Sequence, residues 1–180
     1  MNKLVDYINE AMVELYHFTN AYNFINIIKD DEWMASCEGN EYFISTTRTK
    51  NATIGYPTQL IDKDNVIRIV FDGRRLNNNF KIKPVDKMRG KMWAIKSTWK
   101  NPEDFELYKK EILTQGNTES EDRVYVNRES IPNAHLYIKE VHINLDNIEH
   151  KYINDIRNYC RRYGIELVEY SNTREFNRGN

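Results

Sequence analysis

The chain has 180 residues and a net charge of -1. This length suits one domain with a sizeable core, and the near-neutral charge argues against a protein whose whole surface is built to bind nucleic acid. The two cysteines, Cys37 and Cys160, show neither a metal-ligand spacing nor a disulfide framework, which is typical of reduced thiols in a cytoplasmic protein. No window is apolar enough to span a membrane and no signal-peptide core opens the chain, so we expect no membrane partner.

The first third of the chain shows alternating helix and strand patterns. Asn20 is a suitable N-cap for a helix that runs to about Asp30 with Phe24 and Ile27 on its apolar side. A preceding strand ends in His17-Phe18-Thr19, so His17 and Thr19 are predicted beside the N-terminus of that helix. The elements predicted in this third are a helix at 2–12, strands at 13–19, 32–36 and 41–48, and the helix that follows Asn20.

The remaining two thirds continue the mixture of short elements. The β-branched run at 66–71 is the clearest strand, and Pro84 places the strand at 80–85 at a sheet edge. Gly164 is expected to stop a long helix that Asp146 caps. The other predicted elements are a helix at 102–113, a polar loop at 114–120, strands at 122–127, 135–145 and 165–170, and a polar tail at 171–180. The sum is a single mixed α+β domain over 1–180, with a helix and strand extension at 146–170.

The stretch at 41–48 is unusual for a buried strand. Large apolar side chains alternate with the small hydroxyls of Ser45, Thr46 and Thr47. Each hydroxyl needs a hydrogen-bond partner when it is buried. The pattern predicts a strand with one face in the core and the other face along a polar cleft.

Three separated motifs together resemble the ADP-ribosyltransferase superfamily. His17-x-Thr19 is similar to the opening motif of its diphtheria-toxin-like branch. Tyr42-Phe43 is similar to the Tyr-Phe pair of that branch, and Tyr56 to its downstream tyrosine that stacks on nicotinamide. Ser45-Thr46-Thr47 and Glu119-x-Glu121 are similar instead to motifs of its cholera-toxin-like branch. The chain therefore looks like a hybrid of the two branches. Taken singly, each motif has a structural alternative. His17-x-Thr19 also fits a structural histidine, Ser45-Thr46-Thr47 a plain edge strand, and Glu119-x-Glu121 a solvated acidic loop.

The resemblance implies a fold, a substrate and a reaction. The fold is a split pair of mainly antiparallel sheets around an NAD cleft, with flanking helices. The reaction is mono-ADP-ribosyl transfer from NAD to a macromolecular acceptor, protein or nucleic acid, with release of nicotinamide. By family analogy the setting is a toxin with an antitoxin partner or a phage effector against its host.

The resemblance also implies roles for single residues. Glu121 is expected to stabilise the oxocarbenium-like ribosyl group, and Glu119 to orient or deprotonate the acceptor. No metal is needed by this chemistry. Ser45 is expected to hold the catalytic glutamate and the cleft wall in position. The other expected NAD-binding residues are His17 at the adenosine ribose, Thr19 at the same sugar or on the nicotinamide side, Tyr42 and Tyr56 around the nicotinamide, Thr46, and Arg48 with Lys50 at the pyrophosphate.

The segment 80–100 is rich in basic residues and carries Trp93 and Trp99. Such a stretch can hold a phosphate backbone while its rings stack on bases, which would let it select a nucleic-acid acceptor. A lysine-rich solvated loop anchored by tryptophans is the alternative. Its cations are Lys81, Lys83, Lys87, Arg89, Lys91, Lys96 and Lys100.

Two rival functions remain open from the sequence. An RNA 2′-phosphotransferase uses the same scaffold and NAD, but it is expected to rely on a basic set of residues in place of paired glutamates. A non-catalytic module that binds nucleic acid or a protein through 80–100 is the second rival.

Overall fold

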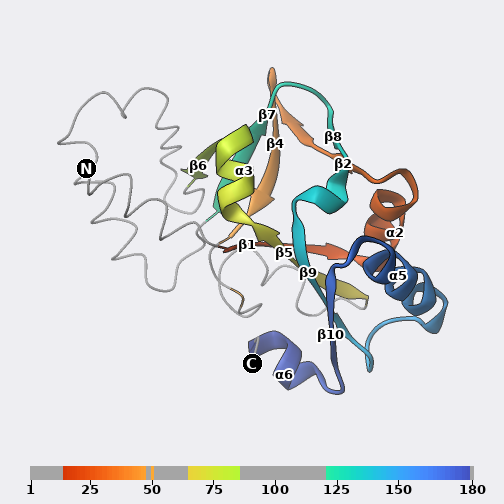
Figure 1. Ribbon diagram of the computed structural model, residues 1–180. Coiled ribbons are helices and arrows are strands. Elements are labelled where there is room, and N and C mark those ends of the chain that lie inside the picture. Colours follow the sequence, from red (N-terminus) through yellow and green to blue (C-terminus); the bar gives the residue numbers. More distant parts are fainter. Residues whose placement is uncertain (1–13, 48–49, 51–64, 86–120, 179–180) are drawn as a thin grey trace.

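A computed structural model describes residues 14–47, 50, 65–85 and 121–178 of the protein. Within these ranges the chain forms two four-stranded sheets, one two-stranded sheet and the helices that flank them (Figure 1). The helices predicted at 2–12 and 102–113 and the loop predicted at 114–120 lie outside the described residues. The described part is a mixed α+β structure with mainly antiparallel strands, as the sequence predicts.

The first four-stranded sheet has the order β1-β5-β9-β10. Its strands are β1 (Glu14–Asn20), β5 (Val66–Asp72), β9 (Ile138–Asn144) and β10 (Glu166–Tyr170). β5 lies between β1 and β9, antiparallel to both, and its run of β-branched residues suits this central position. β10 pairs with β9 in the parallel direction, after a crossover through a helix.

The second four-stranded sheet has the order β3-β4-β7-β6 and is antiparallel throughout. It contains β3 (Ser36–Glu38), β4 (Glu41–Thr46), β7 (Glu121–Val126) and β6 (Lys81–Val85). β6 is an edge strand, as Pro84 predicts, because proline cannot donate a ladder hydrogen bond. A separate pair joins β2 (Glu32–Met34) to β8 (Ser130–Pro132).

The two larger sheets are joined where β1 meets the end of β4. A β-bridge connects Tyr16 and Thr47, and each backbone nitrogen donates to the other residue's carbonyl oxygen at 2.8 Å. Elsewhere along their length, β1 and β4 belong to different sheets. The bridge therefore brings the motif on β1 beside the hydroxyl-rich end of β4.

Two helices cover one face of the first sheet. α2 (Ala21–Asp30) and α5 (His150–Tyr163) lie side by side on it (Figure 1). Asn20 caps α2 as predicted, since its side chain accepts from the backbone nitrogen of Asn23 at 2.8 Å. Gly164 ends α5 in the left-handed conformation, with φ 67°, which a glycine adopts without strain. None of the helices in the described ranges combines the length and apolar character of a membrane span.

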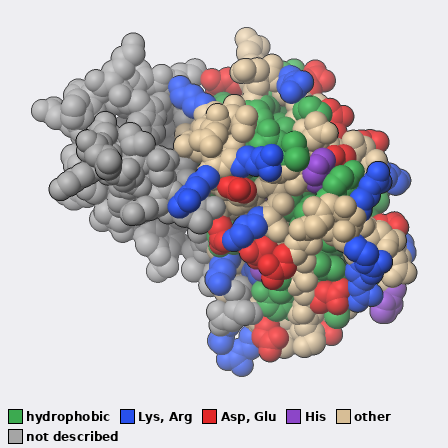
Figure 2. Space-filling model, viewed as in Figure 1, with side chains coloured by type: hydrophobic (Ala, Val, Ile, Leu, Met, Phe, Trp, Pro, Cys, Tyr) green, Lys and Arg blue, Asp and Glu red, His purple; other side chains and the backbone are tan. Residues whose placement is uncertain are grey.

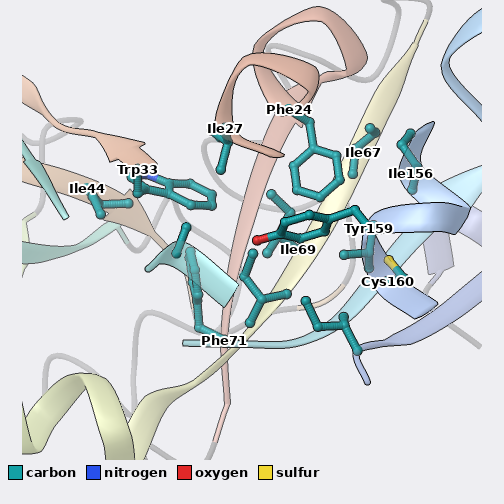
Figure 3. Close-up of a cluster of buried hydrophobic side chains, with 14 of the residues drawn as sticks. Phe24, Ile27, Trp33, Ile44, Ile67, Ile69, Phe71, Ile156, Tyr159 and Cys160 are labelled. Atoms are coloured by element: carbon teal, nitrogen blue, oxygen red, sulfur yellow. The ribbon is translucent and has the colours of Figure 1, made fainter. Parts of the chain in front are cut away.

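The main core lies between these helices and the sheets (Figure 3). Phe24 of α2 packs edge-on against Tyr159 of α5, with ring centroids 6.2 Å apart. At the other end of the cluster, Trp33 packs edge-on against Phe71 at 4.8 Å. Ile69 of β5 lies between the two ends and is fully buried. One continuous apolar cluster thus holds α2 and α5 against the sheet whose first strand carries His17.

The opposite face of the first sheet buries a charged residue. Arg68 of β5 has no exposed surface, and its guanidinium donates to the hydroxyl of Tyr170 at 3.0 Å and contacts His142 Nδ1 at 2.7 Å. It also donates to the carbonyl oxygen of Phe176 at 2.8 Å. Phe176 belongs to α6 (Thr173–Arg178), so the arginine fastens this C-terminal helix beneath the sheet.

Several predicted boundaries are wrong, each for a local reason. α5 begins at His150 and not after Asp146, because the carbonyl of Asn144 accepts from Ile148 and closes a turn there. The predicted strand at 135–145 starts only at Ile138. The first residues of the predicted strand form instead a 3-10 turn, η3 (Ala134–Leu136), because Asp31 accepts from the backbone nitrogen of His135 at 2.9 Å.

Four short elements were missed by the sequence patterns. α3 (Gly73–Asn79) follows β5 and is capped by Asp72. Strand β8 lies between the predicted strands at 122–127 and 135–145, and β3 has only exposed residues. The segment predicted as a polar tail contains α6, whose Phe176 is buried.

We predict that Ile69→Ala lowers the free energy of unfolding by about 2–5 kcal/mol, because it opens a cavity in the centre of a fully packed cluster. Denaturant unfolding monitored by circular dichroism measures this change. Tyr22→Ala on the exposed side of α2 is the control and should stay within about 0.5 kcal/mol of the parent. Equal losses in both variants would contradict the assigned core.

Candidate functional site

A cleft of about 620 Å³ opens beside the junction of the two larger sheets. Its walls come from the end of β1, one side of α2, the segment from β2 to Ser36, and Phe43 to Ser45 of β4. His17, Thr19 and Ser45, which the sequence places in an NAD site, all line it. The motifs from β1 and β4 are therefore brought together in one cavity.

His17 is held in one orientation at the cleft wall. Its Nδ1 lies 2.6 Å from the carbonyl oxygen of Ser45, and its ring meets Trp33 edge-on at 5.0 Å. Burial lowers its pKa to about 4, although the bond to Ser45 works in the opposite direction. The ring is thus neutral near pH 7. Because a carbonyl only accepts, Nδ1 carries the proton and Nε2 is an acceptor, which suits a hydroxyl group of a ligand.

The side of α2 that lines the cleft is polar. Asn23, Asn26 and Asp30 lie along it, three or four residues apart, so they share one face of the helix. The N-terminus of α2 also reaches the cleft, and its backbone N–H groups favour an anion there. Among the described lining residues there is no lysine or arginine.

Glu121 joins this wall through Ser45. The Ser45 hydroxyl donates to Glu121 Oε1 at 2.6 Å, while the Ser45 carbonyl binds His17. The register of β4 against β7 produces this contact, because Ser45 lies opposite Arg123 and Glu121 is the next residue on the same face. A carboxylate from late in the chain and an imidazole from its beginning are thus linked by a single serine.

Arg123 was missed by the sequence patterns, although its spacing of two residues from Glu121 on a strand indicates a shared face. Its Nε donates to Glu121 Oε1 at 3.0 Å, and Nη1 pairs with Glu38. The guanidinium lies over the ring of Phe43, 3.8 Å from its centroid. Its Nη2 is buried without a hydrogen-bond partner within the described ranges, a situation that costs about 1–3 kcal/mol.

Trp33 was also missed as a cleft residue. It is 4 % exposed, lines the cavity, and packs against both His17 and Phe71. No local pattern in the sequence places β2 beside β1, so only the tertiary packing identifies this tryptophan.

Two predicted NAD-binding residues on β4 face away from the cleft. Tyr42 packs against the main core and its hydroxyl donates to Glu129 at 3.2 Å. Thr46 is fully buried and its hydroxyl donates to the carbonyl of Asp122 at 2.8 Å. Side chains alternate along a strand, so Tyr42 and Thr46 share one face of β4 and Phe43 and Ser45 share the other. Ile44, on the face of Tyr42, also lines the cleft, whereas Tyr42 and Thr46 are not among its described lining residues. Phe43 is therefore the aromatic residue of β4 at the cleft.

Of the other predicted site residues, the structure describes Lys50. Glu119, Arg48 and Tyr56 lie outside the described residues, as does most of the basic segment 80–100. Lys50 is described and exposed, and its carbonyl accepts from Arg68 at 2.7 Å. On the face shown in Figure 2, basic and acidic side chains are interspersed over the described surface and do not gather into one patch of a single sign.

No group of three or more His, Cys, Asp or Glu side chains in the described ranges is arranged to hold a metal ion.

Similarity to known proteins is found among solved structures. No protein-family model matches the chain, and no curated protein matches it. Among solved structures, the chain is similar to DarT of Thermus sp. 2.9 in complex with ADP-ribosylated ssDNA. The match covers 90% of this chain and 96% of the DarT chain, at a TM-score of 0.51 and 8% identity. The same protein in complex with NAD+ gives a TM-score of 0.50 at 9% identity, over 90% of this chain and 97% of that one. The chain thus has a DarT-like ADP-ribosyltransferase fold, which confirms the predicted fold class.

We predict that His17 makes the free energy of unfolding decrease as pH is lowered. Its pKa is about 4 in the folded state and ordinarily 6.5, so the unfolded chain binds more protons between these values. The contribution is fully present above pH 6.5 and is lost as pH falls towards about 4. The loss is at most about 3 kcal/mol, and less because the residue keeps some exposure.

Urea unfolding between about pH 7 and about pH 4 measures this dependence. His17→Gln is the comparison, because it removes the titrating ring and leaves the carboxylates in place. Its unfolding free energy should change less steeply with pH than that of the parent. Parallel profiles for the two proteins would show that His17 does not titrate as described.

Proposed function

We propose that this protein is an NAD-dependent mono-ADP-ribosyltransferase that modifies DNA and releases nicotinamide. The observation that carries the proposal is a linked set in an ADP-ribosyltransferase fold: His17 and Ser45 line a cleft, and the Ser45 hydroxyl donates to Glu121. The choice of DNA as acceptor draws on the DarT structure described as a complex with ADP-ribosylated ssDNA.

The cleft suits NAD as a substrate. Its volume of about 620 Å³ falls within the usual range for small-molecule sites, about 300–1,000 Å³. The acceptor nitrogen of His17, the hydroxyl of Thr19 and the amides along α2 suit ribose hydroxyls. The N-terminus of α2 suits a pyrophosphate. The comparison with DarT in complex with NAD+ supports the same choice.

The chemistry assigns Glu121 the central role. In the reaction the bond between the ribose C1′ and the nicotinamide nitrogen breaks, and its electron pair leaves with nicotinamide. The sugar develops positive charge, which a carboxylate held at the ribose stabilises. The acceptor atom then bonds to C1′ and loses a proton. We assign that proton to Glu119, which the sequence places two residues before Glu121.

The remaining assignments follow the sequence, with two changes. Thr46 is no longer assigned to NAD, because its buried hydroxyl donates to the carbonyl of Asp122. Phe43 takes the place of Tyr42 as the aromatic wall from β4, because only Phe43 lines the cleft. Tyr56 at the nicotinamide, Arg48 with Lys50 at the pyrophosphate, and 80–100 at the nucleic acid stay predictions. A toxin role in the cytoplasm, an antitoxin partner and a phage origin stay predictions as well.

We predict that Glu121→Gln lowers nicotinamide release by about 100-fold or more while the Kd for NAD changes by less than about threefold. The amide keeps the size of the side chain but cannot stabilise the positive sugar. Calorimetry measures NAD binding, and NAD labelled in its phosphates, incubated with single-stranded DNA, RNA or lysate protein, measures transfer. Glu166→Gln on β10, an exposed glutamate outside the cleft, is the control and should keep full activity.

Each other outcome points to a different function. Label found only in protein would show that the acceptor is protein and not DNA, with the same ADP-ribosyl transfer reaction. Removal of a 2′-phosphate from RNA in an NAD-dependent manner would favour the phosphotransferase. Nucleic-acid or protein binding that is indifferent to Glu121→Gln, with no nicotinamide release by the parent, would favour a non-catalytic module.

A further inference from the structure

We propose that Arg123 is a positioning residue that, together with Glu38, sets the orientation of the Glu121 carboxylate for ADP-ribose transfer. This inference rests on the proposed function, and it adds a residue pair that the sequence motifs do not contain.

Two donors converge on one oxygen of Glu121. Ser45 Oγ approaches Oε1 from β4 at 2.6 Å, and Arg123 Nε approaches the same oxygen from β7 at 3.0 Å. Donors that come from two different strands restrict the rotation of the carboxylate about its last bond. Ser45 alone would leave that rotation to a single rotatable hydroxyl.

Arg123 is itself fixed on two sides. Nη1 pairs with Glu38, and the guanidinium plane lies 3.8 Å from the ring centroid of Phe43. Glu38 belongs to β3, Phe43 to β4 and Arg123 to β7, which are neighbours in that order in the sheet. The Glu38–Arg123–Glu121 chain therefore spans three strands, and the sheet ladder holds its members in register.

The charge of Arg123 is maintained in this setting. Burial disfavours the charged guanidinium, but the hydrogen bonds and charges of Glu38 and Glu121 outweigh burial and raise the pKa of Arg123. Glu121 thus faces a permanent positive charge at hydrogen-bond distance.

A purely stabilising role explains this pair less well. The side chains of Arg123 and Glu121 are 7 % and 11 % exposed, and an apolar pair in such a buried position is often at least as stable. In addition, Arg123 Nη2 is buried without a partner in the described ranges. A β-branched residue would suit β7 better if stability were the only requirement. The arginine is therefore better explained by what it does to Glu121.

The geometry predicts which kinetic constant changes. Neither Arg123 nor Glu121 is among the described residues that line the cleft, whereas His17 and Thr19 are. Glu121 is linked to the cleft wall by Ser45, and Arg123 acts on that linked carboxylate. Loss of Arg123 should therefore leave NAD binding intact and impair only the step that needs a correctly placed carboxylate. Misplacement of a catalytic group by about 1 Å costs about 100-fold in rate.

The test measures kcat and KM for NAD with the full chain and single-stranded DNA as the acceptor. Arg123→Gln should lower kcat by about 10–100-fold and change KM by less than about twofold. Arg123→Lys should recover less than about a third of the parent kcat, because an ammonium restores the charge but not the planar fork that bridges two carboxylates. Near-complete recovery by lysine would reduce the role of Arg123 to charge alone and overturn the inference.

Two further variants protect the test against loss of folding. Glu38→Gln acts at a half-exposed position and removes only the anchor of Arg123, so it should fold and lower kcat by about 3–10-fold. Arg157→Gln is the control, since Arg157 forms a more exposed arginine–glutamate pair with Glu169 at 2.7 Å between α5 and β10, away from the cleft. It should keep parent kinetics. If Arg123→Gln is unfolded, the Glu38 variant decides.

The outcomes separate this inference from the proposed function. A parent protein that releases no nicotinamide refutes the proposed function, and the positioning role fails with it. An active parent whose Arg123→Gln or Glu38→Gln variant is folded and keeps kcat within about twofold refutes the positioning role alone.

Discussion

The site depends on one residue that uses both its backbone and its side chain. The carbonyl of Ser45 binds the His17 ring and its hydroxyl binds Glu121, so a single position on β4 connects β1 to β7. This arrangement requires the β-bridge between Tyr16 and Thr47, which sets the two sheets at a fixed offset. If that offset shifted by one residue, the side chain at the junction would point to the opposite face. The sheet junction therefore determines the chemistry of the cleft.

The same junction separates a neutral part of the site from a charged part. Burial against Trp33 keeps His17 uncharged, while Glu121 lies against the permanent charge of Arg123. A neutral imidazole at the cleft wall is thus linked through Ser45 to a carboxylate beside a guanidinium. In the proposed function the imidazole suits hydroxyl groups of the substrate and the carboxylate suits a developing cation.

Strand alternation explains which residues of the hydroxyl-rich stretch serve the site. Ser45 and Phe43 face the cleft, whereas Thr46 and Tyr42 complete hydrogen bonds on the core side. Motif resemblance treats neighbouring residues as one group, but a pleated strand divides them between two faces. For the same reason Arg123 shares the face of Glu121, a relation that a spacing of two on a predicted strand already indicates.

Local patterns in the amino-acid sequence are sufficient to predict the mixed α+β class, most of the strands, the Asn20 cap and the Gly164 stop, because these follow from preferences of a few adjacent residues. Motif order also predicts that His17, Thr19, Ser45 and Glu121 share one site, and the structure brings His17, Thr19 and Ser45 to one cleft and links Glu121 to Ser45. The folded chain is needed to see that Trp33 lines the cleft, that Tyr42 is not among its described lining residues, and that Glu38 reaches Arg123 across two strand pairings. Those facts depend on which strands become neighbours and in what register, and pairing between distant segments leaves no mark on local patterns.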